Sequence, residues 1–291
     1  MSTSPPEQNI GRVAIHGLGL MGGSLGLALR DRGVFVAGFA RRPETRAAAL
    51  ERGMVDACFA DPAEAAAEAD IVVLCTPVMT IPELAVSIAP ALKPDAIITD
   101  VGSTKAWLHQ QIDHPAFVGS HPMCGSEKTG LEASFAGLYQ DAVTVVTSTK
   151  ERSTAADEHA EKVAALWKSI GSRVICMPSQ DHDKLVARTS HLPHLAASLL
   201  VAAANRERHP HLGDLMGSGY ESTTRLAEGS ADVWHDIVKT NASAVRAELA
   251  SFRAELDHLL QQIDQGIDTG DFNAVRDFLD RQAKTRISQR T

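Results

Sequence analysis

The chain has 291 residues, of which 44% are hydrophobic and 22% charged, and a formal net charge of -8 at pH 7. This length allows one or two domains with a buried core, and the negative charge argues against a nucleic-acid or anionic-membrane surface. No apolar run approaches the roughly 20 residues needed to span a membrane, and residues 1–9 lack the apolar segment of a signal peptide. The four cysteines are far apart and form no C-x-x-C pattern, so we expect free thiols in a cytoplasmic protein and no metal site (Cys58, Cys75, Cys124, Cys176).

A glycine-rich loop follows the first predicted strand, residues 12–16, and precedes a helical segment. Gly17, Gly19 and Gly22 form G-x-G-x-x-G, in which the first glycine permits a tight turn. The second lets the backbone approach a pyrophosphate, and the third lets the helix pack close to the strand. We therefore predict that residues of this loop bind a dinucleotide at the helix N-terminus; the alternative is a structural turn without a ligand (Gly17, Gly19, Leu20, Met21, Gly22).

The second predicted strand, residues 34–39, bears on which dinucleotide is bound. NAD sites usually carry Asp or Glu here, whereas this strand leads into Ala40-Arg41-Arg42 with no carboxylate before Glu44. Two guanidinium groups suit a 2′-phosphate, because the planar fork binds phosphate oxygens bidentately. The sequence therefore favours NADP over NAD, which stays possible; the alternative is that Arg41 and Arg42 are only solvated loop charges.

Residues 1–178 alternate between short apolar runs and helical segments. This alternation predicts βαβ units and a mostly parallel, doubly wound dinucleotide-binding (Rossmann) domain of the α/β class. The helical segments include 44–52, 62–69 and 80–92, and the predicted strands are 12–16, 34–39, 71–75, 96–100, 116–119, 142–147 and 173–177.

Residues 179–291 carry no strand signal from 209 onward and are predicted to form an all-α C-terminal domain. Ser179 is a candidate N-cap for a long helix over about 180–208, and further helices are expected near 212–227, 231–265 and 271–287. Small Ala/Leu-rich helical domains often bury apolar faces against a twin subunit, so we expect a homodimer through these helices. The alternative is that they pack only against the first domain.

Two polar clusters follow later strands, at the sheet edge where open α/β sheets bind ligands. Ser103 lies in Thr99-Asp100-Val101-Gly102-Ser103-Thr104-Lys105, where it either serves the chemistry or caps a helix. His121 follows the strand 116–119 and is a candidate general base, because an imidazole titrates near neutrality. His191 and His194 share a helix face, but no H-E-x-x-H pattern accompanies them, so no metal site is predicted.

Several motifs in order resemble the prephenate/arogenate dehydrogenase family of tyrosine biosynthesis, over about residues 10–285. They are Gly-Leu-Gly-Leu-Met-Gly-Gly-Ser, Cys-Thr-Pro (75–77), Asp-Val-Gly-Ser-Thr-Lys (100–105), His-Pro-Met-x-Gly-Ser-Glu (121–127), Asp-His-Asp (181–183), Ser-His-Leu-Pro-His (190–194) and Ser-Gly-Tyr-Glu-Ser-Thr-Thr-Arg-Leu-Ala (218–227). The resemblance implies oxidative decarboxylation of arogenate or prephenate with hydride transfer to a nicotinamide cofactor.

The resemblance also implies roles for individual residues. His121 is expected to accept the hydrogen bond of the substrate C4 hydroxyl, and Ser103 to orient that hydroxyl and the imidazole. Arg225 is expected to grip a substrate carboxylate. His191 and His194 are expected to line the pocket near the substrate side chain, and Thr76 and Pro77 to contact the cofactor.

Asp232 bears on the substrate, because the ammonium group of arogenate needs a nearby acceptor. By its spacing to Asn241 it resembles the acid of arogenate-using relatives, and the alternative is that it caps a helix beginning near Val233. Two departures from the family pattern are His16, which either touches the cofactor or only packs, and Ser222, where many relatives carry an acid.

Rival functions from other classes are a β-hydroxyacid-type dehydrogenase, an enzyme for an aminated prephenate analogue and a non-catalytic NADP-binding sensor. The presence of His121, Ser103 and Arg225 speaks against the sensor.

Overall fold

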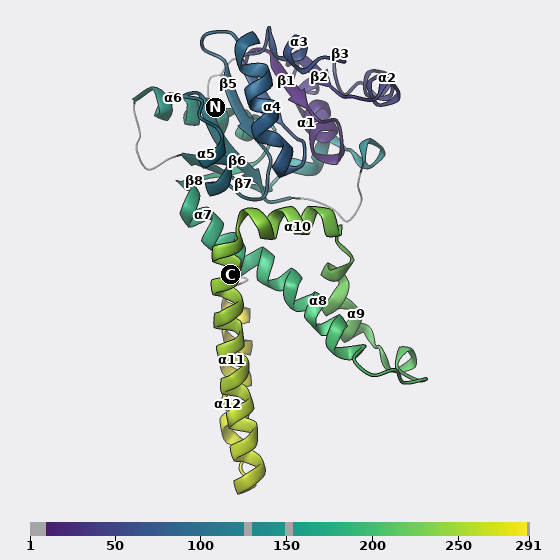
Figure 1. The fold of residues 1–291 in the computed structure, drawn as a ribbon, viewed down its shortest axis with the longest axis vertical. Coiled ribbons are helices and arrows are strands. Elements are labelled where there is room, and N and C mark those ends of the chain that lie inside the picture. Colours follow the sequence, from purple (N-terminus) through teal and green to yellow (C-terminus); the bar gives the residue numbers. More distant parts are fainter. Residues whose placement is uncertain (1–9, 125–129, 149–153, 290–291) are drawn as a thin grey trace, which may run out of the picture. The chain divides into compact units, whose positions relative to one another are not determined.

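The computed structural model describes residues 10–124, 130–148 and 154–289, which divide into two compact units, Met1–Ala242 and Ser243–Thr291. The first unit contains an eight-stranded sheet in the order β3-β2-β1-β4-β5-β6-β7-β8 (Figure 1). The order reverses at β1, which pairs in parallel with both β2 and β4. The predicted doubly wound α/β fold with a helical C-terminal part is therefore confirmed.

The strands form where the sequence places β-branched and apolar residues. They are β1 (Val13–His16), β2 (Val36–Phe39), β3 (Ala57–Phe59), β4 (Ile71–Leu74), β5 (Ile97–Asp100), β6 (Phe117–Pro122), β7 (Val143–Ser148) and β8 (Arg173–Pro178). All residues of β1, β2, β4 and β5 are buried, as expected for strands covered on both faces. The short β3 was not predicted from the sequence.

One end of the sheet departs from the parallel pattern. β6 pairs antiparallel with β7, with His121 opposite Val145, and β7 pairs in parallel with β8. The sequence predicted that His121 follows the strand. β6 instead runs to Pro122, so His121 lies within the strand. The antiparallel partner holds the extended backbone of His121 at the carboxyl end of β6.

Helices cover both faces of the sheet. On one face α1 (Leu20–Arg30) and α6 (Thr154–Ser169) bury Leu25, Leu29 and Trp167 against β1 and its neighbours. On the other face α3 (Pro62–Ala66), α4 (Ile81–Ile88) and α5 (Ala106–Gln111) bury apolar side chains such as Ile81 and Leu108. α2 (Pro43–Glu51) follows the β2 loop. These two cores fix the carboxyl edge of the sheet, where Thr76, Ser103 and His121 lie.

The predicted long helix after residue 179 is interrupted. It consists of α7 (Ser179–Val186), a π-helical turn (Ala187–His191) and α8 (Leu192–Ala204). Pro193 has no N–H and its ring would clash with the carbonyl four residues earlier, so the wider π turn accommodates it. Ser179 is the first helical residue and Pro178 occupies the N-cap position, so the predicted cap is wrong.

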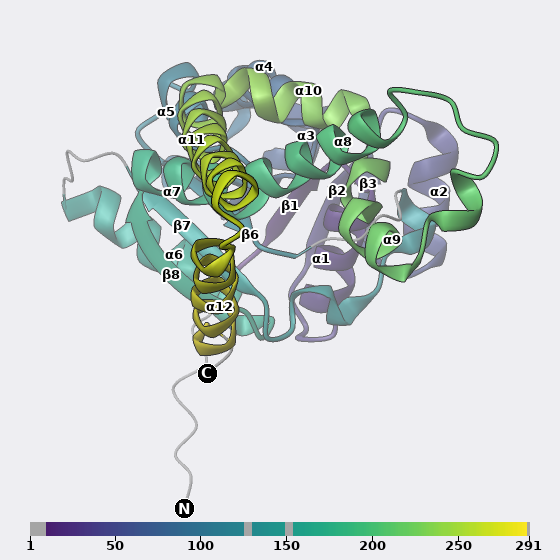
Figure 2. The same cartoon turned by 90° about the horizontal axis from the view of Figure 1, so that it is seen from below.

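The remaining helices of the first unit are short. α9 (Ser218–Thr224) runs into a 3₁₀ turn (Arg225–Glu228), and both pack against α8. α10 (Ala231–Thr240) ends at Asn241, so the predicted continuous helix 231–265 is broken there. The Asn241 side chain donates to the Asp183 carbonyl at 2.8 Å, a contact made possible by its departure from helical backbone angles. Figure 2 shows α8 and α10 in front of the sheet, and α10 contacts the turn Val78–Thr80 that follows β4.

The second unit consists of α11 (Ala242–Thr269) and α12 (Asn273–Ser288). Gly270, with φ 75°, turns the chain between them. Phe252, Leu256 and Leu260 recur every four residues on α11 and are 42%, 49% and 49% exposed. In the part of the chain that the structure describes, no helix is long and apolar enough to cross a membrane. The predicted domain boundary at residue 178 coincides with the end of β8 and stays a prediction, because the compact units divide at Ala242.

Candidate active site

The glycine loop has the geometry of a phosphate cradle. Gly17 has φ 102°, a conformation that L side chains rarely adopt, and a Cβ on Gly22 would lie 1.9 Å from the Gly17 carbonyl oxygen. A Cβ on Gly19 would meet nothing within 4 Å, so the loop is open at the position where a pyrophosphate would approach. Leu20 and Met21 begin α1, whose first-turn N–H groups have no intrahelical acceptor. The residues present therefore fit a dinucleotide.

The end of β4 lies against this loop. A Cβ on Gly17 would be 2.8 Å from the Cys75 carbonyl oxygen and 3.0 Å from the Thr76 side chain. Thr76 Oγ1 is hydrogen-bonded to Thr80 Oγ1 at 3.0 Å, and Pro77 directly precedes the turn Val78–Thr80. The structure thus brings Thr76 and the glycine loop together at the strand-order reversal, and their contact with a cofactor stays a prediction.

The loop after β2 presents its arginines to solvent. Arg46 Nη1 donates to the carbonyl oxygens of Ala40 and Arg41 at 2.9 Å and holds the loop backbone. Arg41 is exposed, and its guanidinium has no partner among residues 10–124, 130–148 and 154–289. Arg42 is also exposed and lies 3.8 Å from the Glu44 carboxylate. Arg41 is therefore better placed than Arg42 to bind an anion.

His16 is buried and does not reach a surface from which it could touch a cofactor. It is 0% exposed and packs against the Phe39 ring at 5.4 Å. Both ring nitrogens lack a hydrogen-bond partner in the described structure, and burial lowers the pKa of His16 to about 4. The packing alternative for His16 therefore holds in this structure.

The turn after β5 is built on a buried ion pair. Lys105 and Asp100 are both 0% exposed and form a salt bridge. Lys105 Nζ also donates to the Ser120 carbonyl at 2.9 Å, and Asp100 accepts from the Gly102 and Ser120 backbone N–H groups. Burial raises the pKa of Asp100 and lowers that of Lys105, and the attraction between the two charges opposes both shifts. The pair closes the turn that carries Ser103.

Ser103 does not cap the following helix. α5 begins at Ala106, and the N–H groups of Lys105 and Ala106 are accepted by the two Asp183 carboxylate oxygens at 2.8 and 2.9 Å. The capping alternative for Ser103 is therefore wrong, because Asp183 of α7 accepts the N–H groups at the start of α5. Ser103 is partly buried and has no side-chain hydrogen bond within the described residues, which leaves its hydroxyl available at the carboxyl edge.

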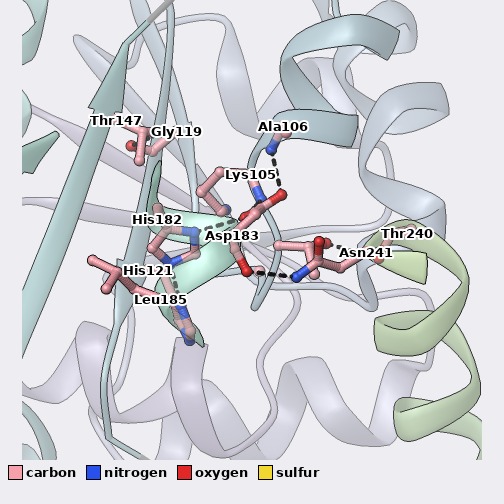
Figure 3. Close-up of polar contacts among 12 residues, drawn as sticks. Lys105, Ala106, Gly119, His121, Thr147, His182, Asp183, Leu185, Thr240 and Asn241 are labelled. Carbon is pink, nitrogen blue, oxygen red and sulfur yellow. Dashed lines mark hydrogen bonds and ion pairs between the residues drawn. The ribbon is translucent and has the colours of Figure 1, made fainter. Parts of the chain in front are cut away.

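His121 is joined to α7 through a second histidine (Figure 3). His121 Nδ1 lies 2.9 Å from His182 Nε2, and His182 Nδ1 lies 2.7 Å from Asp183 Oδ1. The remaining nitrogen of His121, Nε2, points away from His182 on a side chain that is partly exposed. Burial lowers the pKa of His121 well below its usual value, and the charges of His182, Lys105 and His191 add to this. A neutral His121 can accept a proton.

His191 and His194 meet at one tryptophan. His194 stacks on the Trp234 indole with ring centroids 3.5 Å apart, and His191 meets the same indole edge-on at 6.0 Å. Both histidines are buried, and His191 Nδ1 lies 3.4 Å from Asn241 Nδ2. Burial lowers the pKa of His194 and takes that of His191 to about 4. The π turn, α8 and α10 therefore bring two neutral imidazoles and an indole together.

Arg225 and Asp232 are not joined to these groups by any contact between described residues. Arg225 begins the 3₁₀ turn after α9 and is exposed, without a hydrogen bond or ion pair in the described chain. Asp232 is exposed and is the second residue of α10, whose N-cap position is Ser230, so the capping alternative for Asp232 is wrong. The roles assigned to Arg225 and Asp232 stay predictions. Gly125, Ser126 and Glu127 of the His121 motif lie outside the described residues.

The sequence did not assign roles to several residues that the structure brings into the site. They are Asp100, Lys105, His182, Asp183, Trp234 and Asn241. The signals available were the acid and lysine that flank Ser103 and the Asp-His-Asp motif directly after the last strand. In the described part of the chain, no group of three or more His, Cys, Asp or Glu side chains is arranged to hold a metal ion.

A dinucleotide fold with an acceptor imidazole at the same sheet edge defines a nicotinamide dinucleotide-dependent dehydrogenase. The sequence matches the family described as "Prephenate dehydrogenase, nucleotide-binding domain" over residues 25–176, and "Prephenate dehydrogenase, dimerization domain" over residues 178–276. The chain belongs to the prephenate dehydrogenase family, so the β-hydroxyacid-type alternative is set aside.

Three relatives illustrate the similarity. The chain is 35% identical to cyclohexadienyl dehydrogenase from Zymomonas mobilis, covering 85% of this chain and 86% of that one. Prephenate dehydrogenase from A. aeolicus, solved with hydroxyphenyl propionate and NAD+, has a TM-score of 0.85 at 29% identity and covers 94% and 98% of the two chains. Synechocystis arogenate dehydrogenase has a TM-score of 0.81 at 27% identity, with coverage of 94% and 99%.

Proposed function

We propose that this chain catalyses the oxidative decarboxylation of prephenate, arogenate or both, with NADP as the preferred hydride acceptor. The observation that carries the proposal is the free Nε2 of a neutral His121 at the carboxyl end of β6, beside a glycine loop that fits a dinucleotide. When bound, the nicotinamide supplies the acceptor for the hydride that leaves C4 of the substrate.

The side chains of this protein accept the substrate proton and bind the substrate carboxylates. His121 Nε2 accepts the proton of the C4 hydroxyl as the ring carbon is oxidised, which is general base catalysis. Ser103, on the turn closed by Asp100 and Lys105, orients the hydroxyl and the imidazole. Loss of CO2 follows because the resulting ring carbonyl draws in the electrons of the breaking carbon–carboxylate bond, and the ring becomes aromatic.

Substrate anchoring is assigned to the helices of the first unit. Arg225 binds a substrate carboxylate, and its support is an exposed guanidinium with no partner within the described residues. His191 and His194 line the side-chain pocket, supported by their shared contact with Trp234. Asp232 receives the ammonium of arogenate, so arogenate is the preferred substrate; its support is an exposed carboxylate near the start of α10.

The preference for NADP rests on the loop after β2. Arg41 is exposed and unpaired among the described residues, and Glu44 is the first carboxylate after the strand. The chain is also proposed to form a homodimer through its C-terminal helices, supported by the dimerization-domain match and the exposed apolar stripe of Phe252, Leu256 and Leu260. The four free cysteines agree with a cytoplasmic location.

The direct test is a steady-state assay of the purified chain at 340 nm with prephenate or arogenate, each paired with NADP or NAD. We expect nicotinamide reduction, release of CO2 and an aromatic product, with the highest kcat/KM for arogenate and NADP. Turnover only of an aminated prephenate analogue would move the substrate assignment to that compound. Tight NADP binding without turnover of any of them would indicate the sensor function instead.

A further inference from the structure

The candidate base His121 is one end of a series of three side chains. Asp183 Oδ1, His182 and His121 are linked by contacts of 2.7 and 2.9 Å, and Figure 3 shows them running from α7 to the end of β6. His182 is 0% exposed and Asp183 is 3% exposed, so water does not compete for these contacts. Because these groups are buried and contact one another, few arrangements of their protons satisfy all the contacts.

The Asp183 carboxylate fixes the direction of the series. Its oxygens already accept the backbone N–H groups of Lys105 and Ala106, and the Asp183 carbonyl accepts from Asn241 Nδ2. A carboxylate in this position can only accept from His182, so the proton of that ring lies on Nδ1. The neutral ring then has a lone pair on Nε2, which accepts from His121 Nδ1–H. His121 is left with its lone pair on Nε2, the nitrogen on the open side.

The charges around His121 explain why such a series is useful. Burial and the neighbouring Lys105, His182 and His191 disfavour an imidazolium on His121 and lower its pKa. A base that cannot hold positive charge is weak, unless the charge can move to a better place. The only carboxylate in direct contact with either ring, within the described residues, is Asp183 on the far side of His182.

The geometry points to a proton relay in which His182, held by Asp183, receives the proton that His121 would otherwise have to carry. This inference rests on the proposed function. The substrate hydroxyl proton moves to His121 Nε2 while the Nδ1 proton of His121 moves to His182 Nε2, and the positive charge comes to rest beside Asp183. The C4–H electron pair leaves as hydride, and the O–H pair becomes the second C–O bond.

The proton taken from the substrate is returned to the product after decarboxylation. The electrons of the carbon–carboxylate bond enter the ring and leave a phenolate oxygen, and the relay runs backwards to return one proton to it. His182 and Asp183 are therefore positioning and proton-holding residues, whereas His121 touches the substrate. No proton has to be exchanged with solvent during the reaction.

Two substitutions at one position separate proton transfer from positioning. His182→Gln can place its amide oxygen near the site of Nε2, where it accepts from His121 Nδ1–H but takes up no proton. His182→Phe keeps the ring and loses both functions. His109→Gln is the control, because His109 is another part-buried histidine, bonded to Thr147 Oγ1 at 3.0 Å and outside the series.

We expect both His182 variants to lower kcat by about 10²-fold or more, with KM for substrate and NADP within about threefold. His109→Gln should stay close to the unsubstituted protein. Full activity in His182→Gln would overturn the proton transfer, and full activity in His182→Phe would overturn the whole relay. Thermal unfolding by circular dichroism identifies a variant that has lost its fold, and the other His182 variant then decides.

A measurement without cofactor or substrate tests the proton positions directly. In ¹⁵N-histidine NMR of the free protein, the signals of His121 and His182 are assigned by their loss in His121→Asn and His182→Gln. Both rings should be protonated on Nδ1, and a His121 protonated on Nε2 would overturn the relay. If the unsubstituted chain turned over neither substrate, the proposed function would fail, and this measurement would still decide whether the series exists.

Discussion

Replacement of Lys105 by Met tests whether the buried ion pair holds the active-site turn. The substitution keeps the length of the side chain but leaves Asp100 with a charge that only backbone N–H groups from Gly102 and Ser120 can compensate. Breaking a buried pair by removing one partner typically costs about 3–5 kcal/mol. At about 2–4 °C per kcal/mol for a domain of this size, Tm should fall by roughly 6–20 °C.

The loss should depend on pH in a defined direction. Burial raises the pKa of Asp100 above its value in the unfolded chain, and Lys105 supplies the opposite charge that counters this among the described residues. The folded variant then binds more protons than the unfolded one, so its stability decreases as pH rises through the folded pKa and recovers as pH falls. Between pH 8 and pH 5 the deficit should shrink, by at most about 1.4 kcal/mol per pH unit.

Urea unfolding at both pH values, followed by tryptophan fluorescence, measures this deficit. The matched control is Lys93→Met, which removes an ion pair with Asp70 whose side chains are 35% and 46% exposed and which should cost at most about 1 kcal/mol. Asp100→Asn combined with Lys105→Met should recover part of the loss, because the uncompensated charge is gone. Equal losses in Lys105→Met and Lys93→Met would refute the reasoning.

The remaining predictions concern the site. His121→Asn should lower kcat by roughly 10²–10⁴-fold with little change in cofactor affinity; near-normal turnover would remove His121 from the mechanism. Arg225→Gln should raise KM for substrate by roughly 10–150-fold, matching about 1.5–3 kcal/mol for a charge-assisted contact, and an equal rise in KM for cofactor would contradict the assignment. Arg41→Ala should weaken NADP more than Arg42→Ala does and leave NAD unchanged, as measured by fluorescence titration; unaltered NADP affinity would count against the preference. Asp232→Asn should shift kcat/KM from arogenate toward prephenate, and an unchanged ratio would leave the choice of substrate to other residues.

The sequence predicts those parts of the fold that depend on local patterns. The glycine loop after β1 forms because its glycines adopt backbone angles and close approaches that other residues cannot. The strands β1, β4 and β5 form from apolar runs that are buried on both faces. Both causes act within a few residues of sequence. Since parallel strands share a carboxyl edge, the placement of Thr76, Ser103 and His121 near that edge also follows from local evidence.

Contacts between distant segments could not be predicted in the same way. His182 and Asp183 lie in α7 beyond its first-turn acid, Asp181. Nothing near them in the sequence indicates that Asp183 accepts the N–H groups of Lys105 and Ala106, which are 78 and 77 residues away. The same holds for His194, whose stacking partner Trp234 comes from another helix.

The interrupted helices show how a local pattern can be present and still be overridden. Residues 231–265 have helical spacing throughout, yet the chain leaves the helix at Asn241, where the buried side chain donates to the Asp183 carbonyl. Asn is a weak helix former because its amide competes for backbone groups, and here the amide bonds the Asp183 carbonyl at the position where the helix ends. That bond ties the end of α10 to the residue that holds His182. The departure from the predicted helix therefore lies where α10 is joined to the residue that contacts the neighbour of the proposed base.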